Sequence, residues 1–290
     1  MKIKPLVLFQ TLLPQHGLSR IMHWLMRCQK LPGHNFFLRW AIRKYKIQLD
    51  EILEPDLFDR HSYPDLNSCF TRALKPEARP VAPDELDVCC PADGTISEIG
   101  YINDTRLLQA KGREYTLTEL LGGNNKLIDT FRNGAYATIY LSPSDYHRVH
   151  MPYNGKLTTM IHVPGRLFSV SPWNMKYVPR LFARNERVIS VFNTVEGSMA
   201  VIMVGAIFVG SIETVWEGEI TPPAGKKIST SIYPDSAGDK LGKGDEMGRF
   251  NMGSTVIVLF TERAVEWHQD RQAGTPVKMG QILGKLTPVV

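Results

Sequence analysis

Three segments of this 290-residue chain supply a carboxylate, an imidazole and a hydroxyl, a set that can support nucleophilic attack. Ser254 follows Gly253, whose carbonyl has no side chain beside it to hinder an attacking hydroxyl. A serine hydroxyl needs a base, and we predict His150 for this role because imidazole titrates near neutrality. Asp93 would orient that imidazole, as in a Ser-His-Asp triad. These residue types predict self-cleavage between Gly253 and Ser254.

Each of these residues also has a purely structural interpretation. Asp93 precedes a glycine, and Asp-Gly is a common hairpin turn. His147 and His150 are three residues apart, so on a helix they would share a face and could bind a metal ion. Nearby prolines disfavour a long helix there, and no third ligand has suitable spacing. We therefore expect no metal site.

The region that must position these residues is rich in β-structure. From residue 88 onward, short β-branched runs such as 136–141 and 201–205 alternate with glycines, a pattern typical of strands. The pattern P-x-[DN]-G-x-[IL] occurs at 91–96 and again at 152–157, and its Asp-Gly and Asn-Gly pairs predict hairpins. We predict an α+β fold with a β-rich catalytic domain, 88–290, that resembles a duplicated barrel-sandwich hybrid.

Residues 1–87 are predicted to form N-terminal amphipathic helices and a linker. Apolar side chains recur with helical spacing at Leu18, Ile21, Met22 and Leu25. A second helix should carry Phe36, Phe37 and Trp40 beside a basic stripe of Arg39, Arg43 and Lys46. Such faces are typical of helices that lie in a membrane interface, but they could also pack on the protein's own core.

The positive charge of the chain is concentrated in its first fifty residues. Residues 1–50 contain nine Lys/Arg and one acid, a charge of +8, whereas the remaining residues carry −3. This segment predicts contact with an anionic membrane surface. We expect no nucleic-acid partner, because no nucleic-acid-binding motif is present. The apolar run 6–13 ends at Pro14 and is too short to span a bilayer as a helix.

The chain resembles the bacterial type of phosphatidylserine decarboxylase, a pyruvoyl-dependent membrane enzyme. The resemblance rests on the motifs at 91–94, 145–152, 182–187, 209–216, 246–250 and 253–255. One departure is Met252, which stands where the family's cleavage motif usually has leucine. Methionine and leucine have similar volumes, so we expect processing to occur.

The resemblance implies a function for these residues. Cleavage would give chains 1–253 and 254–290 and convert Ser254 into a pyruvoyl group, the cofactor that forms a Schiff base with phosphatidylserine. Loss of CO₂ would yield phosphatidylethanolamine, with His147 or His150 as the proton donor. The enzyme would lie on the cytoplasmic side of the inner membrane, as a homodimer of two-chain units. Arg148 and Arg166 could bind a lipid phosphate or pair with surface acids.

Two other functions remain possible from the residues alone. A serine hydrolase would use Ser254, His150 and Asp93 without a cofactor, but 253–257 lacks the second glycine of a G-x-S-x-G motif. A non-catalytic carrier module of the hybrid-barrel type would be much smaller and would not need all three groups.

Overall fold

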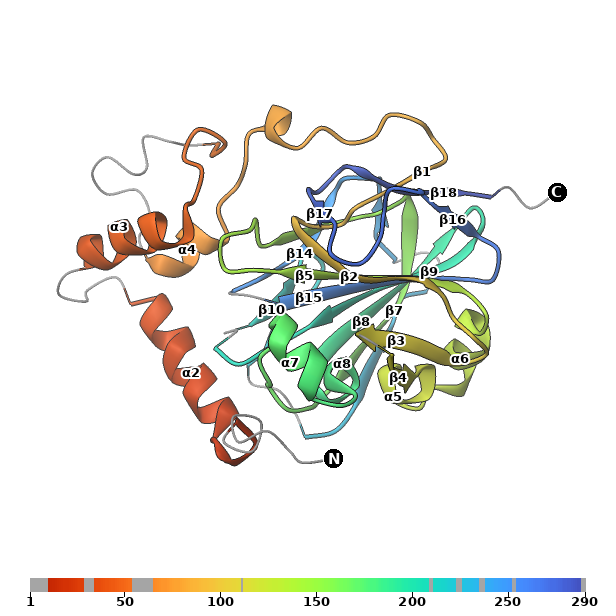
Figure 1. Cartoon of the computed structure of the whole chain (residues 1–290), viewed down its shortest axis with the longest axis horizontal. Helices are drawn as coiled ribbons and strands as arrows, with labels where there is room; N and C mark the ends of the chain where they lie inside the picture. The colour runs from red at the N-terminus through yellow and green to blue at the C-terminus, as the bar shows by residue number, and fades with distance from the viewer. Residues whose placement is uncertain are drawn as a thin grey trace.

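The computed structural model describes residues 10–28, 34–53, 65–110, 112–208, 211–222, 226–234, 238–251 and 254–287 (Figure 1). The helices are α2 (Gln15–Met26), α3 (His34–Tyr45), α4 (Leu66–Phe70), the 3-10 helix η2 (Pro76–Ala78), α5 (Leu117–Leu120), α6 (Asn125–Phe131), α7 (Pro172–Tyr177) and α8 (Leu181–Arg184). Strands outnumber helices in the described residues, as the sequence predicted.

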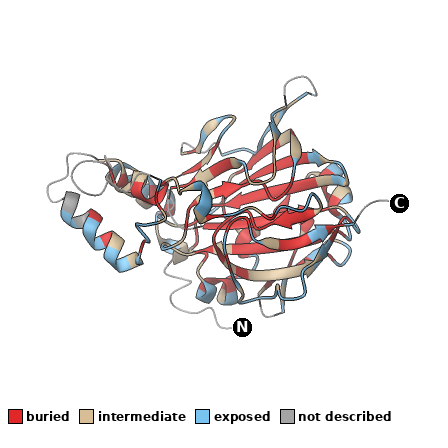
Figure 2. Cartoon of the chain, turned by 90° about the horizontal axis from the view of Figure 1, so that it is seen from above, coloured by how far each residue is buried: buried red, intermediate tan, exposed pale blue. Residues whose placement is uncertain are grey.

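The largest sheet is antiparallel and contains nine strands of the described chain. Its order is β12 (Ser229–Ile232), β7 (Gly155–Val163), β8 (Arg187–Thr194), β9 (Gly197–Val204), β15 (Ser254–Phe260), β5 (Ala135–Leu141), β2 (Gly94–Tyr101) and β17 (Pro276–Val277), and β13 (Lys240–Leu241) also pairs with β7. All seven residues of β15 are buried. Figure 2 shows that buried residues follow the strands. The β-branched runs at 136–141 and 201–205, predicted as strands, form most of β5 and the second half of β9.

Smaller antiparallel sheets pack beside the large one. They are β1 (Asp87–Cys89) with β18 (Ile282–Leu286) and β16 (Val265–Trp267); β11 (Gly218–Thr221) with β10 (Ile212–Thr214), β14 (Glu246–Phe250) and β6 (Arg148–His150); and β3 (Arg106–Ala110) with β4 (Arg113–Thr116). The fold is thus mixed helix and sheet with open sheets, in agreement with the α+β prediction.

The hairpins predicted at Asp93-Gly94 and Asn154-Gly155 are wrong. Strand β1 pairs with β18, whereas β2 pairs with β5 and β17, so the segment before Gly94 connects two different sheets. Gly155 likewise begins β7 of the large sheet, after β6 of another sheet. A Cβ atom at Gly94 would lie 2.2 Å from the carbonyl oxygen of Tyr140. Glycine is therefore needed there for close strand approach, not for a turn.

The N-terminal helices lie at one side of the molecule (Figure 1). Helix α3 packs Leu38 against a small cluster that includes Ile52 and Cys69, separate from the main core. On its outer surface Phe36 is 70% exposed and Trp40 is 50% exposed. Apolar side chains of α2 are also exposed. Within the described residues, no helix has both the length and the apolar character required to cross a bilayer.

Candidate active site

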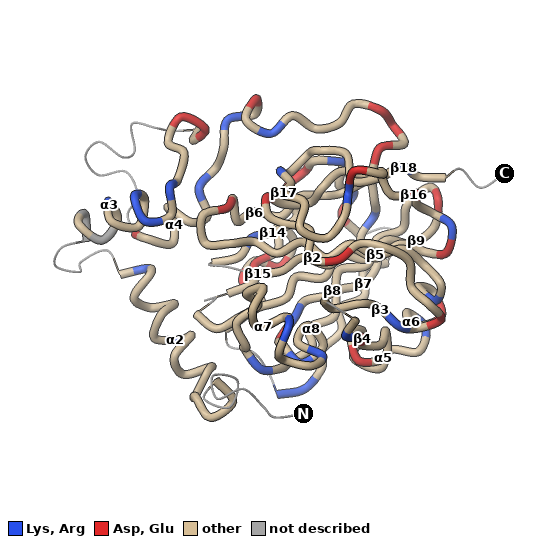
Figure 3. Tube along the Cα trace, in the orientation of Figure 1, with Lys and Arg blue, Asp and Glu red and all other residues tan. Residues whose placement is uncertain are grey.

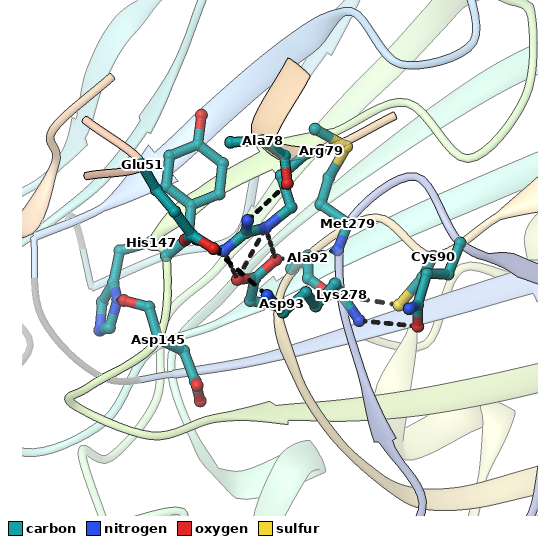
Figure 4. A network of polar contacts seen from close by, with 12 residues as sticks. Glu51, Ala78, Arg79, Cys90, Ala92, Asp93, Asp145, His147, Lys278 and Met279 are labelled. Carbon is teal, nitrogen blue, oxygen red and sulfur yellow. Dashed lines mark hydrogen bonds and ion pairs between the residues drawn. The ribbon is translucent and has the colours of Figure 1, made fainter. Parts of the chain in front are cut away.

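Asp93 lies just before β2 and is held by a guanidinium group. Arg79 Nε donates to both carboxylate oxygens, at 2.9 and 3.0 Å, and its Nη2 donates to Oδ2 at 2.6 Å. The backbone N–H of Met279 donates to Oδ1 at 2.9 Å. Both side chains of this ion pair are under a tenth exposed. Figure 4 shows the Arg79 guanidinium directly against the Asp93 carboxylate. The acid predicted from the sequence is thus buried and fixed by a charged partner.

Arg79 also connects Asp93 to the N-terminal region. Its Nη2 donates to Glu51 at 2.8 Å, and Lys278 Nζ donates to the same carboxylate at 3.3 Å. Burial alone would lower the pKa of Arg79, but hydrogen bonds to Asp93 and Glu51 outweigh it and raise this pKa. The backbone N–H of Lys75 donates to the Glu51 carbonyl. A segment that follows α3 therefore helps to hold the acid in place.

His150 ends β6, and both of its ring nitrogens are bonded. Because a carbonyl can only accept, Nδ1–H donates to the Gly244 oxygen at 2.7 Å, and Nε2 accepts from the Tyr146 hydroxyl at 3.0 Å. Its backbone N–H donates to the Pro91 carbonyl, which brings it beside the Asp93 loop. Burial lowers the pKa of His150, so the imidazole is neutral at pH 7. The direct His150–Asp93 hydrogen bond expected of a triad is absent among these contacts.

His147 is fully buried and keeps one nitrogen without a partner. Its Nδ1–H donates to the Asp145 carbonyl at 2.7 Å, whereas Nε2 has no hydrogen-bond partner among the described residues. The Phe70 ring packs edge-on against the imidazole at 5.7 Å. Burial lowers the pKa of His147 to about 4. Nε2 carries a lone pair, because Nδ1 holds the ring hydrogen, but the lowered pKa makes it a weak proton acceptor at pH 7. The strand at 148–150 also removes the helical face that a metal-binding His147–His150 pair would need.

Ser254 is the first residue of β15 and pairs with Leu141 on β5. It is completely buried, and its Oγ has no hydrogen-bond partner within the described part of the chain. Gly253 and Met252, the other residues of the predicted cleavage site, lie outside the described residues. A buried hydroxyl without a partner costs free energy, and Ser254 shares this state with Ser190 and Thr255 of the same sheet.

A row of aromatic rings runs from the exposed surface of α3 to His147. Trp40 contacts Tyr45 at 6.3 Å between ring centroids, Tyr45 contacts Phe70 at 5.8 Å, and Phe70 contacts the imidazole. Edge-on contacts of this kind are favourable. The N-terminal helices therefore help to exclude water from His147 and so contribute to its lowered pKa.

Neither arginine proposed as a phosphate ligand points to a clear anion site. Arg148 Nη1 donates to Glu246 at 2.7 Å and its Nε donates to the Thr71 carbonyl. Arg148 therefore pairs with an acid, which is the second of the two roles that the sequence left open for it. Arg166 Nη2 donates to the Thr11 carbonyl at 3.4 Å.

Comparison with known proteins identifies the family. The sequence profile described as phosphatidylserine decarboxylase matches residues 66–285, and a second profile described as PSD matches residues 5–46. The chain belongs to the phosphatidylserine decarboxylase family. Among curated proteins, the phosphatidylserine decarboxylase proenzyme of Alkalilimnicola ehrlichii is 54% identical over 87% of this chain and 86% of that protein. The proenzyme of the same name from Methylococcus capsulatus is 52% identical, over 95% of this chain and 94% of its own length.

Some residues of this decarboxylase-family site were not found by sequence reasoning. Arg79 and Glu51 were not singled out, because sequence does not distinguish a buried arginine from a surface one. Tyr146 lies within a family motif, but its contact with His150 depends on how the two side chains are oriented. For Arg79, the only available signal was its position shortly before the Asp93 motif.

Proposed function

We propose that this chain is a phosphatidylserine decarboxylase that cuts itself between Gly253 and Ser254, giving chains 1–253 and 254–290. The observation that carries the proposal is the position of Ser254, which follows Gly253 in the sequence and begins the fully buried strand β15, in a chain of this family. The name proenzyme, given to the curated relatives, supports processing. The reaction would convert phosphatidylserine into phosphatidylethanolamine and CO₂.

The cofactor of this proposal is a pyruvoyl group formed from Ser254. The residues present fit it: such a group ends a chain, and Ser254 begins a buried strand held on both sides by β5 and β9. The new chain end would thus stay in position after the cut. The ketone of a pyruvoyl group reacts with an amine and withdraws the electron pair that remains when CO₂ leaves.

In processing, His150 accepts the proton of Ser254. Its Nε2 lone pair is bound by Tyr146, so this hydroxyl must turn away or pass the proton on. Burial lowers the pKa of His150, while its hydrogen bond to the Gly244 carbonyl and then the charges of Glu246 and, last, Asp93 act in the opposite direction. We infer that Asp93 assists through its charge, without direct contact. Arg79 is the positioning residue that fixes Asp93.

In decarboxylation, His147 is our candidate for returning a proton to the substrate carbon. Near pH 7 it is neutral, and its Nε2 carries no hydrogen because Nδ1–H is used by the Asp145 carbonyl. A proton that His147 donates must therefore first be taken up, which the unpartnered Nε2 permits.

We further propose that the segment 1–87 associates with the cytoplasmic face of the inner membrane and that 88–290 forms the catalytic domain. The exposed Phe36 and Trp40 of α3 support a membrane contact. Substituting both by serine should reduce sedimentation with anionic vesicles while processing continues; unchanged sedimentation would contradict this role. A homodimer of the two-chain units remains a prediction that sedimentation equilibrium can check.

The duplicated barrel-sandwich architecture also remains a proposal. Its support is that the two members of each sequence repeat begin strands at equivalent points. In the repeat at 91–96 and 152–157, strands β2 and β7 begin at the glycines Gly94 and Gly155; a second repeat, G-x-x-x-G at 244–248 and 280–284, places the starts of β14 and β18 two residues after Gly244 and Gly280.

A denaturing gel with intact-mass analysis tests the function. Purified protein should contain two chains that meet at 253/254, the shorter one without a free amino group. Ser254→Ala should remain a single chain and release no CO₂. The matched control is Ser190→Ala, which removes another buried hydroxyl without a partner from the same sheet and should be cut normally. A chain that remains uncut yet decarboxylates phosphatidylserine would refute the proposal; an uncut chain that hydrolyses esters would favour a serine hydrolase.

A further inference from the structure

A pocket of about 430 Å³ lies between the C-terminal end of α3 and Asp93. Its volume is within the roughly 300–1,000 Å³ usual for small-molecule sites. Ser142 lines it and directly follows the residue that pairs with Ser254. Tyr146, which also lines it, binds His150. The pocket therefore reaches from the helical segment to Asp93 and to residues that adjoin Ser254 and His150.

Positive charge exceeds negative charge in the wall of this pocket. The cationic side chains are Lys44, Lys46, Arg72, Arg79 and Lys278, and the carboxylates are Glu51, Asp93 and Asp145. Arg79 is bound to Glu51 and Asp93, and Lys278 to Glu51. With five cations against three carboxylates, the pocket has a net attraction for an anion.

Lys44 and Lys46 supply the positive charge at the mouth. Both are exposed, and neither forms an ion pair within the part of the chain that the structure describes. Lys44 lies in the last turn of α3, and Lys46 directly follows the helix. Figure 3 shows basic residues on this part of α3. An ammonium group binds a phosphate as a compact point charge with three donors.

The exposed aromatic residues of the same helix indicate which anion arrives here. Phe36 and Trp40 lie one to two turns before Lys44, and both are largely exposed. Aromatic side chains of interfacial helices insert at the boundary of the acyl chains, and basic side chains meet the headgroups. A lipid beside these rings would therefore bring its phosphate to the lysines.

We propose that Lys44 and Lys46 bind the phosphate-ester anion of a lipid headgroup at the mouth of this pocket. The bound phosphate directs the amino-acid part of the headgroup inward, toward Asp93 and Ser254. The proposal rests on the proposed function, because it assigns a substrate contact to the same site. It adds a specificity role for the end of α3 that is separate from membrane attachment.

The test compares two double variants on one helix. Lys44→Gln/Lys46→Gln and Arg39→Gln/Arg43→Gln each remove two positive charges, but only the first pair lines the pocket. The substrate is a short-chain phosphatidylserine below its micellar concentration, so that membrane binding does not enter. We expect the lysine pair to raise KM about tenfold with kcat within twofold. The arginine pair should weaken vesicle binding but leave this KM within twofold.

The outcomes separate this proposal from the proposed function. If the wild-type protein is neither cut nor active, the proposed function fails. If it is cut and active but both pairs change KM equally, the phosphate site is refuted. Glycerophosphoserine should inhibit the wild-type enzyme competitively, with an inhibition constant that rises about tenfold in the lysine pair. Inhibition by inorganic phosphate at equal strength would identify a free-phosphate site and overturn the headgroup assignment.

Discussion

The candidate site has two halves that differ in how their polar atoms are satisfied. In the first half, every polar side-chain atom of Asp93 and His150 is hydrogen-bonded. The carboxylate accepts from Arg79 and from a backbone N–H, and both imidazole nitrogens have partners. In the second half, Ser254 Oγ and His147 Nε2 are buried without a partner in the described chain. The first half is fixed, and the second is free to react.

The difference indicates where chemistry takes place. An unsatisfied buried polar atom costs about 1–3 kcal/mol, so Ser254 Oγ and His147 Nε2 both lack a stabilisation that most buried groups have. The fixed half supplies charge and position, and the unsatisfied half supplies the nucleophile and a proton acceptor. Single substitutions can alter one half while leaving the other intact.

The largest effect should come from His150→Ala. Loss of a general base reduces a rate about 10²- to 10⁴-fold, so the 37-residue fragment should hardly form. A time course on denaturing gels measures it. His162→Ala is the control, because His162 is equally buried but pairs with Glu186 away from the site. If His147→Ala stops cleavage and His150→Ala does not, the base belongs to the unsatisfied half.

Removing Arg79 should have the next largest effect, on stability. Arg79→Ala leaves the buried Asp93 charge without its partner, which costs about 3–5 kcal/mol of the free energy of unfolding. Urea denaturation in the uncut Ser254→Ala background measures this loss. Arg249→Ala removes a more exposed ion pair and should cost about 1 kcal/mol or less. Equal losses in the two variants would show that the fixed half has no special role in stability.

Lowering the pH should reduce the free energy of unfolding through His147, which belongs to the unsatisfied half. The pKa of His147 is about 4 in the folded protein against 6.5 in the unfolded chain, so between these values only the unfolded chain takes up the proton. Stability from this group is present above pH 6.5 and is lost as pH falls. Between pH 7 and pH 5 the loss should be about 2 kcal/mol. Over the same pH change, the Ser254→Ala/His147→Gln variant should lose about 2 kcal/mol less of its free energy of unfolding than Ser254→Ala does. An identical pH dependence of the two variants would contradict the assignment of this loss to His147.

The smallest effect should come from Tyr146→Phe. This change frees the lone pair of His150 Nε2 by removing one hydrogen bond worth about 1 kcal/mol, so cleavage should become about fivefold faster. Single-turnover cleavage after refolding measures the rate. Slowing by tenfold or more would instead show that the phenol hydroxyl passes the serine proton to the imidazole.

Sequence reasoning predicted the strands better than the contacts. The runs at 136–141 and 201–205 contain β-branched residues and lie near glycines, so their pattern alone indicated the strands β5 and β9. The contact between Asp93 and Arg79 depends on a linker folding back beside the sheets, which no local pattern encodes. Asp93-Gly94 misled the prediction because the same dipeptide serves tight turns and close strand approach. The unsatisfied state of Ser254 could only emerge from three-dimensional packing.

The central place of β15 has a consequence for the lifetime of the enzyme. Its register runs along the whole of β5 and most of β9, so a cut at its first residue should leave the two pieces associated. Once such a molecule has unfolded, however, recovery requires an encounter between two separate polypeptides and becomes dependent on concentration. The uncut precursor should renature as a single chain; the cut product, after denaturation in dilute solution, should not.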